Sequence, residues 1–315
     1  MNKGVFMKSI TVQVPATSAN CGPGFDCLGV ALNLYNVFTF EPDKEATSNT
    51  YTFEGFGADL LEKEDHSQNL VGIAMERVFK EVNAAPVYGR IHSNTQIPPS
   101  RGLGSSSTAI VGGLLLANAY LQEPLNKDQL LLIANDMEGH PDNVAPAIMG
   151  NLVCAVGGND TVFHSHIDVP SNLTFAVVVP EVIVETSYAR SVLPTELSYK
   201  EAVANVGFAT LFVGSMIQNR MDNLSVALQD YLHVPYRKTL IPYCDDVFTA
   251  AKDHGAYGST ISGSGSTLIA YCSPEHAVTV ADAMSSVFMN NDIDCRRFVL
   301  HADREGAKVV KIKYE

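Results

Sequence analysis

The chain has 315 residues, of which 46% are hydrophobic, and a formal net charge of −13 at pH 7. Its length and apolar content are enough for one large domain or two ordinary domains with real cores, and we expect two. Lys and Arg are outnumbered by Asp and Glu. This balance argues against nucleic acid and against anionic membranes as partners, because both are bound through cationic side chains.

The chain ends and the apolar runs favour a cytoplasmic protein. The longest apolar runs fall short of the roughly 20 residues that a membrane-spanning helix needs. The first residues, MNKGVFMKSITVQV, lack the apolar core and the small-residue cleavage site of a secretory signal. No C-x-x-C pair occurs, so we expect reduced and mostly buried thiols at all six cysteines, Cys21, Cys27, Cys154, Cys244, Cys272 and Cys295.

The first half of the chain mixes strand and helix patterns. Residues rich in β-branched and aromatic side chains predict strands at 8–14, 30–40, 51–56, 87–93, 150–156 and 161–169. Apolar residues at helical spacing predict helices at 68–82, 108–121 and 126–138.

The pattern restarts near Pro170. A strand at 173–180 precedes a long helix at 198–219 and a shorter one at 223–232, and a helix at 244–255 stops at Gly255, which suits a left-handed cap. Two strand candidates then flank SGSG, followed by a helix at 273–291 and two closing strands. We therefore predict an α+β protein with domains at 1–169 and 170–315.

The stretch PPSRGLGSSSTAIVGG, residues 98–113, places two glycines and three serines directly before a helix. One serine is enough to cap a helix, and we expect Ser105, Ser106 or Ser107 to do so. The glycines exceed that need. Free N–H groups and the partial positive charge at a helix start bind phosphate, so the stretch favours an anion site.

Other phosphate and nucleophile motifs are missing. The chain has no G-x-x-x-x-G-K-[ST] loop, no complete G-x-G-x-x-G and no G-x-S-x-G elbow. Three further stretches are weak alone but improbable together: PATSANCGPGFDCLG at 15–29, EGHPDNVAPA at 138–147 and SGSGS at 262–266. His164 and His166 lack a third metal ligand, so we interpret them as surface residues.

These four stretches, in this order and over nearly the whole chain, resemble the motifs of the GHMP small-molecule kinases. The form TSANCGPGFDCLG is similar to the first motif of the homoserine kinases within that family. The resemblance implies a two-domain GHMP-kinase fold with ATP between the domains, and ATP-dependent phosphorylation of the side-chain hydroxyl of L-homoserine in threonine biosynthesis. It also implies a homodimer.

By position, the resemblance implies site residues for nucleotide and metal. The nucleotide loop would comprise Pro99, Ser100, Arg101, Gly102, Leu103, Gly104, Ser105, Ser106 and Ser107. Mg2+ would bind the Ser106 hydroxyl and the Glu138 carboxylate, because this hard ion takes a few protein oxygens and fills its other positions with water and phosphate oxygens. SGSGS would close the back of the phosphate region or pack against the first motif.

For the acceptor, the resemblance implies that Asp26 holds the ammonium group of homoserine and Asn20 its hydroxyl. Arg190 and Arg237 would clamp the carboxylate, a task that suits the planar guanidinium. Thr186 and His140 would line the same pocket.

The implied catalytic residues are Glu138, Asp142, Asn143 and Arg190. Related kinases use an aspartate as base, and Asp142 is the nearest equivalent, but Asn143 is the residue expected to face the substrate. We therefore expect no obligatory base, because phosphoryl transfer depends mainly on alignment and neutralised oxygen charge.

Three alternatives stay open at this stage. The chain could be a kinase for another small alcohol, although Asp26 and the two arginines favour an amino-acid acceptor. It could be a nucleotide-binding regulator that has lost catalytic activity. The joint presence of Ser106, Glu138 and Asn143 disfavours this alternative. An acyl hydrolase using one of the serines is disfavoured because no His/Asp partnership is evident.

Overall fold

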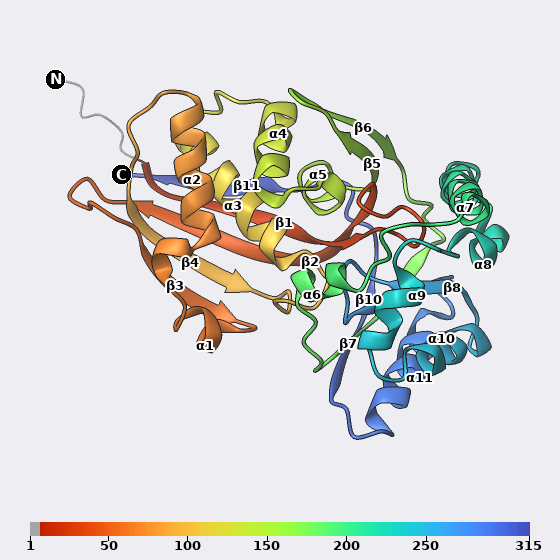
Figure 1. The fold of residues 1–315 in the computed structure, drawn as a ribbon. Helices are drawn as coiled ribbons and strands as arrows, with labels where there is room; N and C mark the ends of the chain where they lie inside the picture. The colour runs from red at the N-terminus through yellow and green to blue at the C-terminus, as the bar shows by residue number, and fades with distance from the viewer. Residues whose placement is uncertain (1–6) are drawn as a thin grey trace.

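The computed structural model describes residues 7–315 (Figure 1). Residues 1–6 lie outside the described part. The expectation that the chain has no secretory signal rests on residues 1–14, so it lies partly outside the described residues. The described residues form two sheets with helices packed on them, as an α+β pattern predicts. Within residues 7–315, no helix combines the length and the apolar character needed to cross a membrane.

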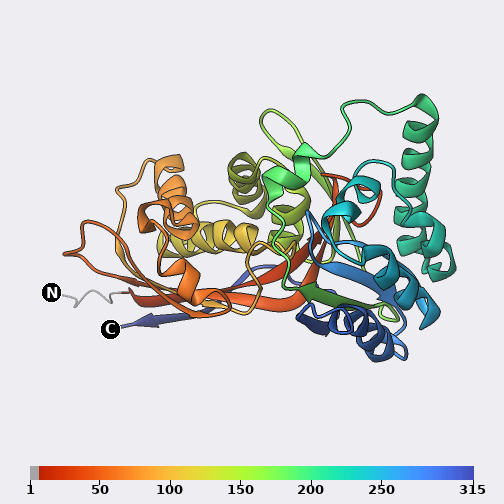
Figure 2. The ribbon, with the colours of Figure 1, turned by 60° about the horizontal axis from the view of Figure 1, so that its bottom comes forward.

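The first sheet has seven strands, with β11, β1, β2, β4 and β3 in that order and with β5 and β6 attached to β2. Their bounds are β1 Met7–Ala19, β2 Leu28–Pro42, β3 Thr50–Gly55, β4 Gly89–Thr95, β5 Leu152–Gly157, β6 Val162–Ile167 and β11 Lys308–Tyr314. Four helices lie over one face: α2 Leu70–Glu81, α3 Ser105–Tyr120, α4 Lys127–Glu138 and α5 Pro141–Met149 (Figure 2). Alternate residues of β1 and β2 point to that face and form the core with these helices.

The second sheet has four strands in the order β10, β7, β9, β8. Their bounds are β7 Thr174–Pro180, β8 Ala256–Ile261, β9 Leu268–Cys272 and β10 Cys295–Leu300. Phe175, Val177 and Val179 of β7 face Phe212 of helix α7 (Tyr199–Gln218). Ala176 and Val178 face the opposite side, where helices α10 (Cys244–Asp253) and α11 (Ala277–Met289) pack. Both faces are covered, so every residue of β7 is buried.

Short helical turns connect these layers. They are α1 Ala58–Leu61, η1 His66–Gln68, α6 Thr186–Ser191, η2 Met221–Asn223, α8 Leu224–Ala227, α9 Val234–Arg237 and η3 Lys238–Leu240. Two of them, α6 and α9, bring Arg190 and Arg237 toward the first sheet's loops.

Most predicted elements are present, and three differ. Strand β1 continues through Pro15 to Ala19, so the first five residues of PATSANCGPGFDCLG belong to the sheet. The helix predicted at 223–232 is only the turn α8, because Asp230 caps a new turn with its carboxylate. Helix α11 begins four residues later than predicted, at Ala277.

The division predicted at residues 169 and 170 falls between β6 and β7. One strand crosses it, because β11 near the end of the chain pairs antiparallel with β1. All six cysteines are free thiols, and Cys21, Cys244 and Cys272 are buried.

Candidate active site

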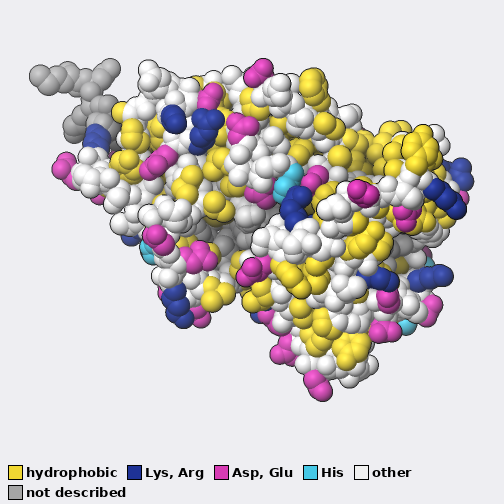
Figure 3. All heavy atoms as spheres, viewed as in Figure 1, with side chains coloured by type: hydrophobic (Ala, Val, Ile, Leu, Met, Phe, Trp, Pro, Cys, Tyr) yellow, Lys and Arg dark blue, Asp and Glu magenta, His cyan; other side chains and the backbone are white. Residues whose placement is uncertain are grey.

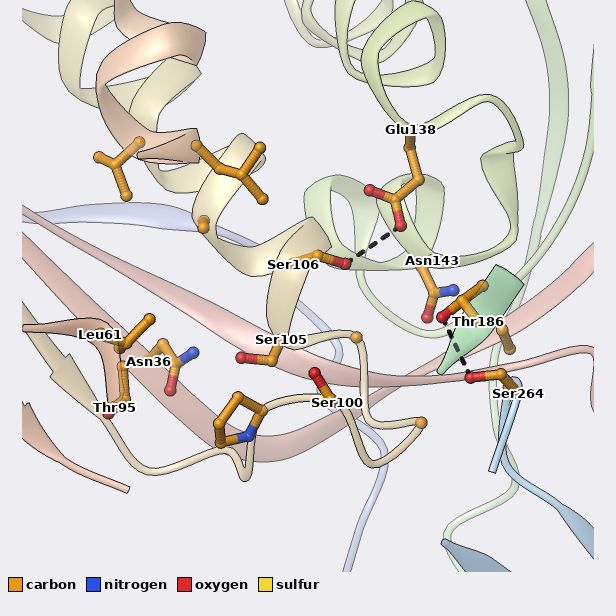
Figure 4. A pocket seen from close by; sticks show the side chains of 18 of the residues that line it. Asn36, Leu61, Thr95, Ser100, Ser105, Ser106, Glu138, Asn143, Thr186 and Ser264 are labelled. Atoms are coloured by element: carbon orange, nitrogen blue, oxygen red, sulfur yellow. Dashed lines mark hydrogen bonds between the residues drawn. The ribbon is translucent and has the colours of Figure 1, made fainter. Parts of the chain in front are cut away.

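A cavity of about 340 Å3 lies where the loops of the two sheets meet. The first sheet contributes the loop after β1, the start of α3 and the start of α5. The second half of the chain contributes α6, α9 and the loop between β8 and β9. All four stretches that the sequence singles out therefore meet at one place. Figure 4 labels lining residues from the stretches at 98–113, 138–147 and 262–266.

The loop before α3 is shaped by its two glycines. Gly104 is the N-cap of α3 with φ of 70°, and its position leaves no side chain to cap the helix. The prediction that a serine caps this helix is therefore wrong, because all three serines already lie inside the first turn. Gly102, with φ of +82°, lies so close to the second sheet's loop that an added Cβ would be 2.2 Å from the Ser262 carbonyl oxygen. The first backbone N–H groups of α3 are left for a ligand.

Ser106 and Ser107 face the carboxylate of Glu138. The Ser106 hydroxyl lies 3.3 Å from Oε1 of Glu138 and donates to it (Figure 4). The Ser107 hydroxyl donates to the same oxygen at 3.0 Å. Glu138 is the last residue of α4, where Gly139 in the left-handed conformation ends the helix. Burial raises the pKa of Glu138, and the two hydroxyls counteract part of that effect. A bound cation would remove the cost of keeping this carboxylate charged.

The start of α5 holds three polar residues in contact. Nδ1 of His140 lies 2.6 Å from Oδ1 of Asp142, and the side chain of Asp142 is buried. The hydrogen bond with Asp142 raises the pKa of His140 against the effect of burial. Asn143 accepts a hydrogen bond from the Thr17 hydroxyl at 2.7 Å, and its amide nitrogen donates to Asp142 at 3.4 Å. Asp142 is thus already engaged by two neighbours.

The loop at 20–27 presents Asp26 to the cavity. Asn20 donates from Nδ2 to the Gly263 carbonyl at 3.0 Å, and its Oδ1 accepts the backbone N–H of Asp26. Arg190 forms a two-point ion pair with Asp26, at 2.7 and 3.1 Å. Within the described chain, one group of three ligand atoms could hold a metal, namely those of Asp26, His140 and Asp142, which lie within 4.8 Å of one another.

Arg237 is buried beneath this loop. Its Nε donates to the Ala189 carbonyl at 3.1 Å and one terminal nitrogen donates to the Gly263 carbonyl at 3.0 Å. Burial, reinforced by the charge of Arg190, lowers the pKa of Arg237 to about 10. Both guanidinium groups lie over the Phe25 ring, 5.4 Å from its centre for Arg190 and 5.1 Å for Arg237. The structure therefore brings the two predicted arginines together.

SGSGS contacts both the loop before α3 and the first motif, PATSANCGPGFDCLG. The Ser262 hydroxyl lies 2.6 Å from the Gly102 carbonyl, to which it donates, and the Gly263 N–H donates to the Ala19 carbonyl at 3.2 Å. The hydroxyl oxygens of Ser264 and Thr186, which both line the cavity, lie 3.4 Å apart (Figure 4).

The cavity wall includes most of the predicted residues. They are Asn20, Asp26, Pro99, Ser100, Gly102, Gly104, Ser105, Ser106, Glu138, His140, Asp142, Asn143, Thr186, Arg190 and Arg237. Three predicted loop residues do not line it. Leu103 and Ser107 are buried, and Arg101 pairs with Glu181 at 3.1 Å. His164, discounted as a metal ligand, lies 3.0 Å from Asp128.

Sequence reasoning missed the residues that hold the loop at 20–27 from behind. Asn205 of α7 donates to the Pro23 carbonyl at 2.9 Å and accepts the N–H of Tyr231. His233 is fully buried and its Nε2 lies 2.9 Å from the Gly22 carbonyl. Asn205 carried a usable signal, because an amide inside an apolar helix on the same face as buried neighbours must find partners. His233 carried none.

Sequence reasoning also missed an apolar end of the cavity. It is lined by Phe53, Phe56, Leu61, Leu70 and Val71, which come from β3, the segment after it and the start of α2. No motif marks these residues, because ordinary apolar side chains form this wall.

Known protein families and relatives match this chain over most of its length. The family models for the GHMP kinases N terminal domain and the GHMP kinases C terminal match residues 69–151 and 212–290. The homoserine kinase of Clostridium acetobutylicum is 42% identical over 96% of this chain and 100% of that protein. That of Carboxydothermus hydrogenoformans is 38% identical over 95% of this chain and 96% of that protein.

One solved structure shares the whole fold. The crystal structure of homoserine kinase from Cytophaga hutchinsonii superposes with a TM-score of 0.87 at 31% identity, and covers 96% of this chain and 98% of that one.

Proposed function

The chain belongs to the homoserine kinases of the GHMP kinase family, and on that premise we propose how its cavity transfers a phosphoryl group from ATP to the side-chain hydroxyl of L-homoserine. One observation carries the proposal. The free N–H groups at the start of α3 and the partly buried carboxylate of Glu138 share one cavity with Asp26, Arg190 and Arg237. The last three side chains suit a zwitterion.

The nucleotide half is the loop at 99–106 with the apolar end of the cavity. The N–H groups at the start of α3 would hold the phosphates, since anions bind where helix donors are free. Gly102 and Gly104 allow the backbone to come close, because neither carries a Cβ. Phe56 and Val71 offer an apolar wall for the base.

The residues around Glu138 fit a magnesium ion. Ser106 and Glu138 supply a hydroxyl and a carboxylate oxygen side by side, which is the donor type that Mg2+ prefers. The burial that raises the pKa of Glu138 also favours a cation at that place. A bound Mg2+ would neutralise phosphate charge and align the phosphates.

The acceptor half is the loop at 20–27 with the two arginines. Asp26 is the proposed partner of the ammonium group, with His140 and Asp142 beside it. A guanidinium has five donors. Arg190 uses two of its nitrogens on Asp26, and Arg237 uses two on backbone carbonyls. Their remaining donors would hold the carboxylate of homoserine, while Asn20 would orient its hydroxyl and Thr186 would line the pocket.

We propose catalysis by positioning, without an obligatory base. Asp142 already accepts hydrogen bonds from His140 and Asn143, so it serves to fix these groups rather than to accept the hydroxyl proton. Asp142→Asn should therefore retain substantial turnover. A loss of about four orders of magnitude, the upper range of general base catalysis, would overturn this part of the proposal.

The resemblance also indicates the product and the oligomeric state. The product would be O-phospho-L-homoserine, made in the cytoplasm for threonine biosynthesis. The protein would act as a homodimer.

The direct test is ADP release from MgATP by the purified protein with L-homoserine, L-serine, L-threonine or mevalonate as acceptor. Stimulation by L-homoserine alone is expected, because only it has both a zwitterionic end and a hydroxyl at the right reach. Stimulation by mevalonate but not by L-homoserine would overturn the assignment of Asp26, Arg190 and Arg237.

A further inference from the structure

Thr17 carries a buried hydroxyl to which the proposed mechanism gives no task. The residue lies near the end of β1, within the stretch PATSANCGPGFDCLG, and its exposure is 0%. The surface is hollowed between the two halves of the molecule in Figure 3, and Thr17 lies beneath the wall of the cavity without being part of its lining. A buried hydroxyl needs a hydrogen-bond partner, and Thr17 has one in Asn143, which does line the cavity.

The contact with Thr17 sets which way the Asn143 amide points. The Thr17 hydroxyl donates to Oδ1 of Asn143 at 2.7 Å, and Nδ2 of Asn143 donates to Oδ1 of Asp142 at 3.4 Å. A side-chain amide has an oxygen that only accepts and a nitrogen that only donates. The reverse orientation would place the amide oxygen against the Asp142 carboxylate, so that two acceptors would face each other. Thr17 and Asp142 therefore specify the same orientation.

This orientation decides what Asn143 offers to a substrate. Its Oδ1 is engaged by Thr17, and its Nδ2 uses one of two N–H groups on Asp142. Within residues 7–315 no other group accepts a hydrogen bond from Nδ2, so the second N–H is left for a ligand of the cavity. Asn143 therefore presents a donor to an oxygen on which charge develops, and not an acceptor for the hydroxyl proton.

Thr17 also contacts the loop before α3. Its backbone N–H donates to the Leu103 carbonyl at 3.2 Å. A Cβ added to Gly104 would overlap the Thr17 hydroxyl oxygen and would lie 3.1 Å from Oδ1 of Asn143. The hydrogen bond between Thr17 and Asn143 therefore has room only because Gly104 has no side chain. Thr17 lies where the loop before α3, strand β1 and the start of α5 meet.

We propose that Thr17 is a positioning residue for phosphoryl transfer. It holds the Asn143 amide with the nitrogen toward the cavity and fixes that nitrogen relative to the loop before α3, so that the free N–H meets an oxygen of the transferring group. The inference rests on the proposed function, because it gives Thr17 a task in the same reaction. Thr17 acts through Asn143 and touches no substrate, since it does not line the cavity.

The first experiment measures ADP release stimulated by L-homoserine in Thr17→Val, in which a methyl group replaces the hydroxyl. We expect kcat to fall about 10- to 100-fold, because misplacing a group at the reacting atoms by about 1 Å has an effect of this size. The KM values for L-homoserine and MgATP should be unchanged. Thr17→Ser keeps the hydroxyl and should retain most of the native kcat.

Thr260→Val is the matched control for this substitution. Thr260 is also buried, at 1% exposure, but its hydroxyl has no hydrogen-bond partner among the described residues. The same loss of a hydroxyl should therefore leave kcat unchanged there. Thr17→Ala, which places no methyl group against Asn143, keeps the test decisive should Thr17→Val fold poorly. Native kcat in a folded Thr17→Val or Thr17→Ala variant would overturn the proposal.

A second pair of variants separates positioning from general support of the fold. In the Asn143→Ala background, Thr17→Val should change kcat by no more than about twofold, because the side chain through which Thr17 acts is absent. A residue that only supports the fold would lower kcat by the same factor in both backgrounds. That result would contradict a positioning role.

The orientation of the amide is also measurable without substrate, by NMR of protein labelled with ¹⁵N at asparagine. Asn143→Ala identifies the Nδ2 signal, which should move in Thr17→Val and keep its position in Thr17→Ser. If the native protein releases no ADP with L-homoserine, the proposed function fails, while this signal still decides whether Thr17 holds the amide. A signal that Thr17→Val leaves in place would refute the inference whatever the activity.

Discussion

The two loops that face each other across the cavity are built in opposite ways. The loop at 102–107 is a local structure: glycines bend it and the helix that follows supplies its donors. The loop at 20–27 leads into strand β2 instead of a helix, and Asn20, Cys21 and Asp26 adopt positive φ without being glycine. It is held instead by Asn205 and His233, which lie 182 and 211 positions from the carbonyls they bind. The nucleotide half takes its shape from neighbours in sequence and is then packed against SGSGS, whereas the acceptor half is held in place mainly by distant side chains.

The largest expected effect is on the nucleotide half. Glu138→Ala should lower kcat about 100- to 1000-fold, because a group that neutralises transition-state charge is lost. Steady-state ADP release at increasing Mg2+ measures it, with Asp136→Ala on the exposed side of α4 as the control. A change confined to the KM for L-homoserine would contradict the assignment of Glu138 to the nucleotide half.

The second prediction concerns the acceptor half alone. Asn205→Ala leaves the Pro23 carbonyl and the Tyr231 N–H without their partner, at a cost of about 1–3 kcal/mol. We expect the KM for L-homoserine to rise about tenfold or more while the KM for ATP is unchanged. Gln218→Ala on the same helix is the control. Equal rises of both KM values would show that Asn205 acts only on general stability.

The two halves of the cavity also differ in how far the sequence predicts them. The glycine and serine loop and the helices α3 and α4 follow from residue type and apolar spacing, since these determinants are local. The roles of the loop and of Glu138 stay predictions from the resemblance. The two-sheet division is also visible from the restart near Pro170. The pairing of β11 with β1 and the anchoring of the loop at 20–27 by His233 were not predictable, because long-range contacts leave no periodic trace. The cap of α3 was misjudged, since the left-handed Gly104 takes the place expected for a serine.

A third effect concerns stability where the loops touch. Gly102→Ala forces a Cβ against the Ser262 carbonyl at a positive φ, and should lower the free energy of unfolding by about 1–3 kcal/mol. Urea denaturation measures it. Gly157→Ala, whose added Cβ would come no nearer than 3.4 Å to another atom, should change the same quantity by less than about 0.5 kcal/mol. Equal stability of the two variants would refute the close contact.

The smallest expected effect is on the pH dependence of the free energy of unfolding. Burial lowers the pKa of His233 from its usual 6.5. Below pH 6.5 the unfolded chain therefore binds a proton that the folded chain refuses, and stability falls with falling pH by up to about 1.4 kcal/mol per pH unit. His233→Gln keeps a donor but cannot titrate, so its stability should fall less steeply between pH 6.5 and 5. Parallel slopes for the two proteins would contradict a neutral buried imidazole.

The central claim is that the two loops serve separate substrates, and calorimetric titration of Asp26→Asn with L-homoserine and with MgATP tests it most directly. We expect that L-homoserine no longer binds, because its ammonium group loses the carboxylate of Asp26, while the Kd for MgATP is unchanged. Retained binding of L-homoserine together with loss of MgATP binding would contradict it.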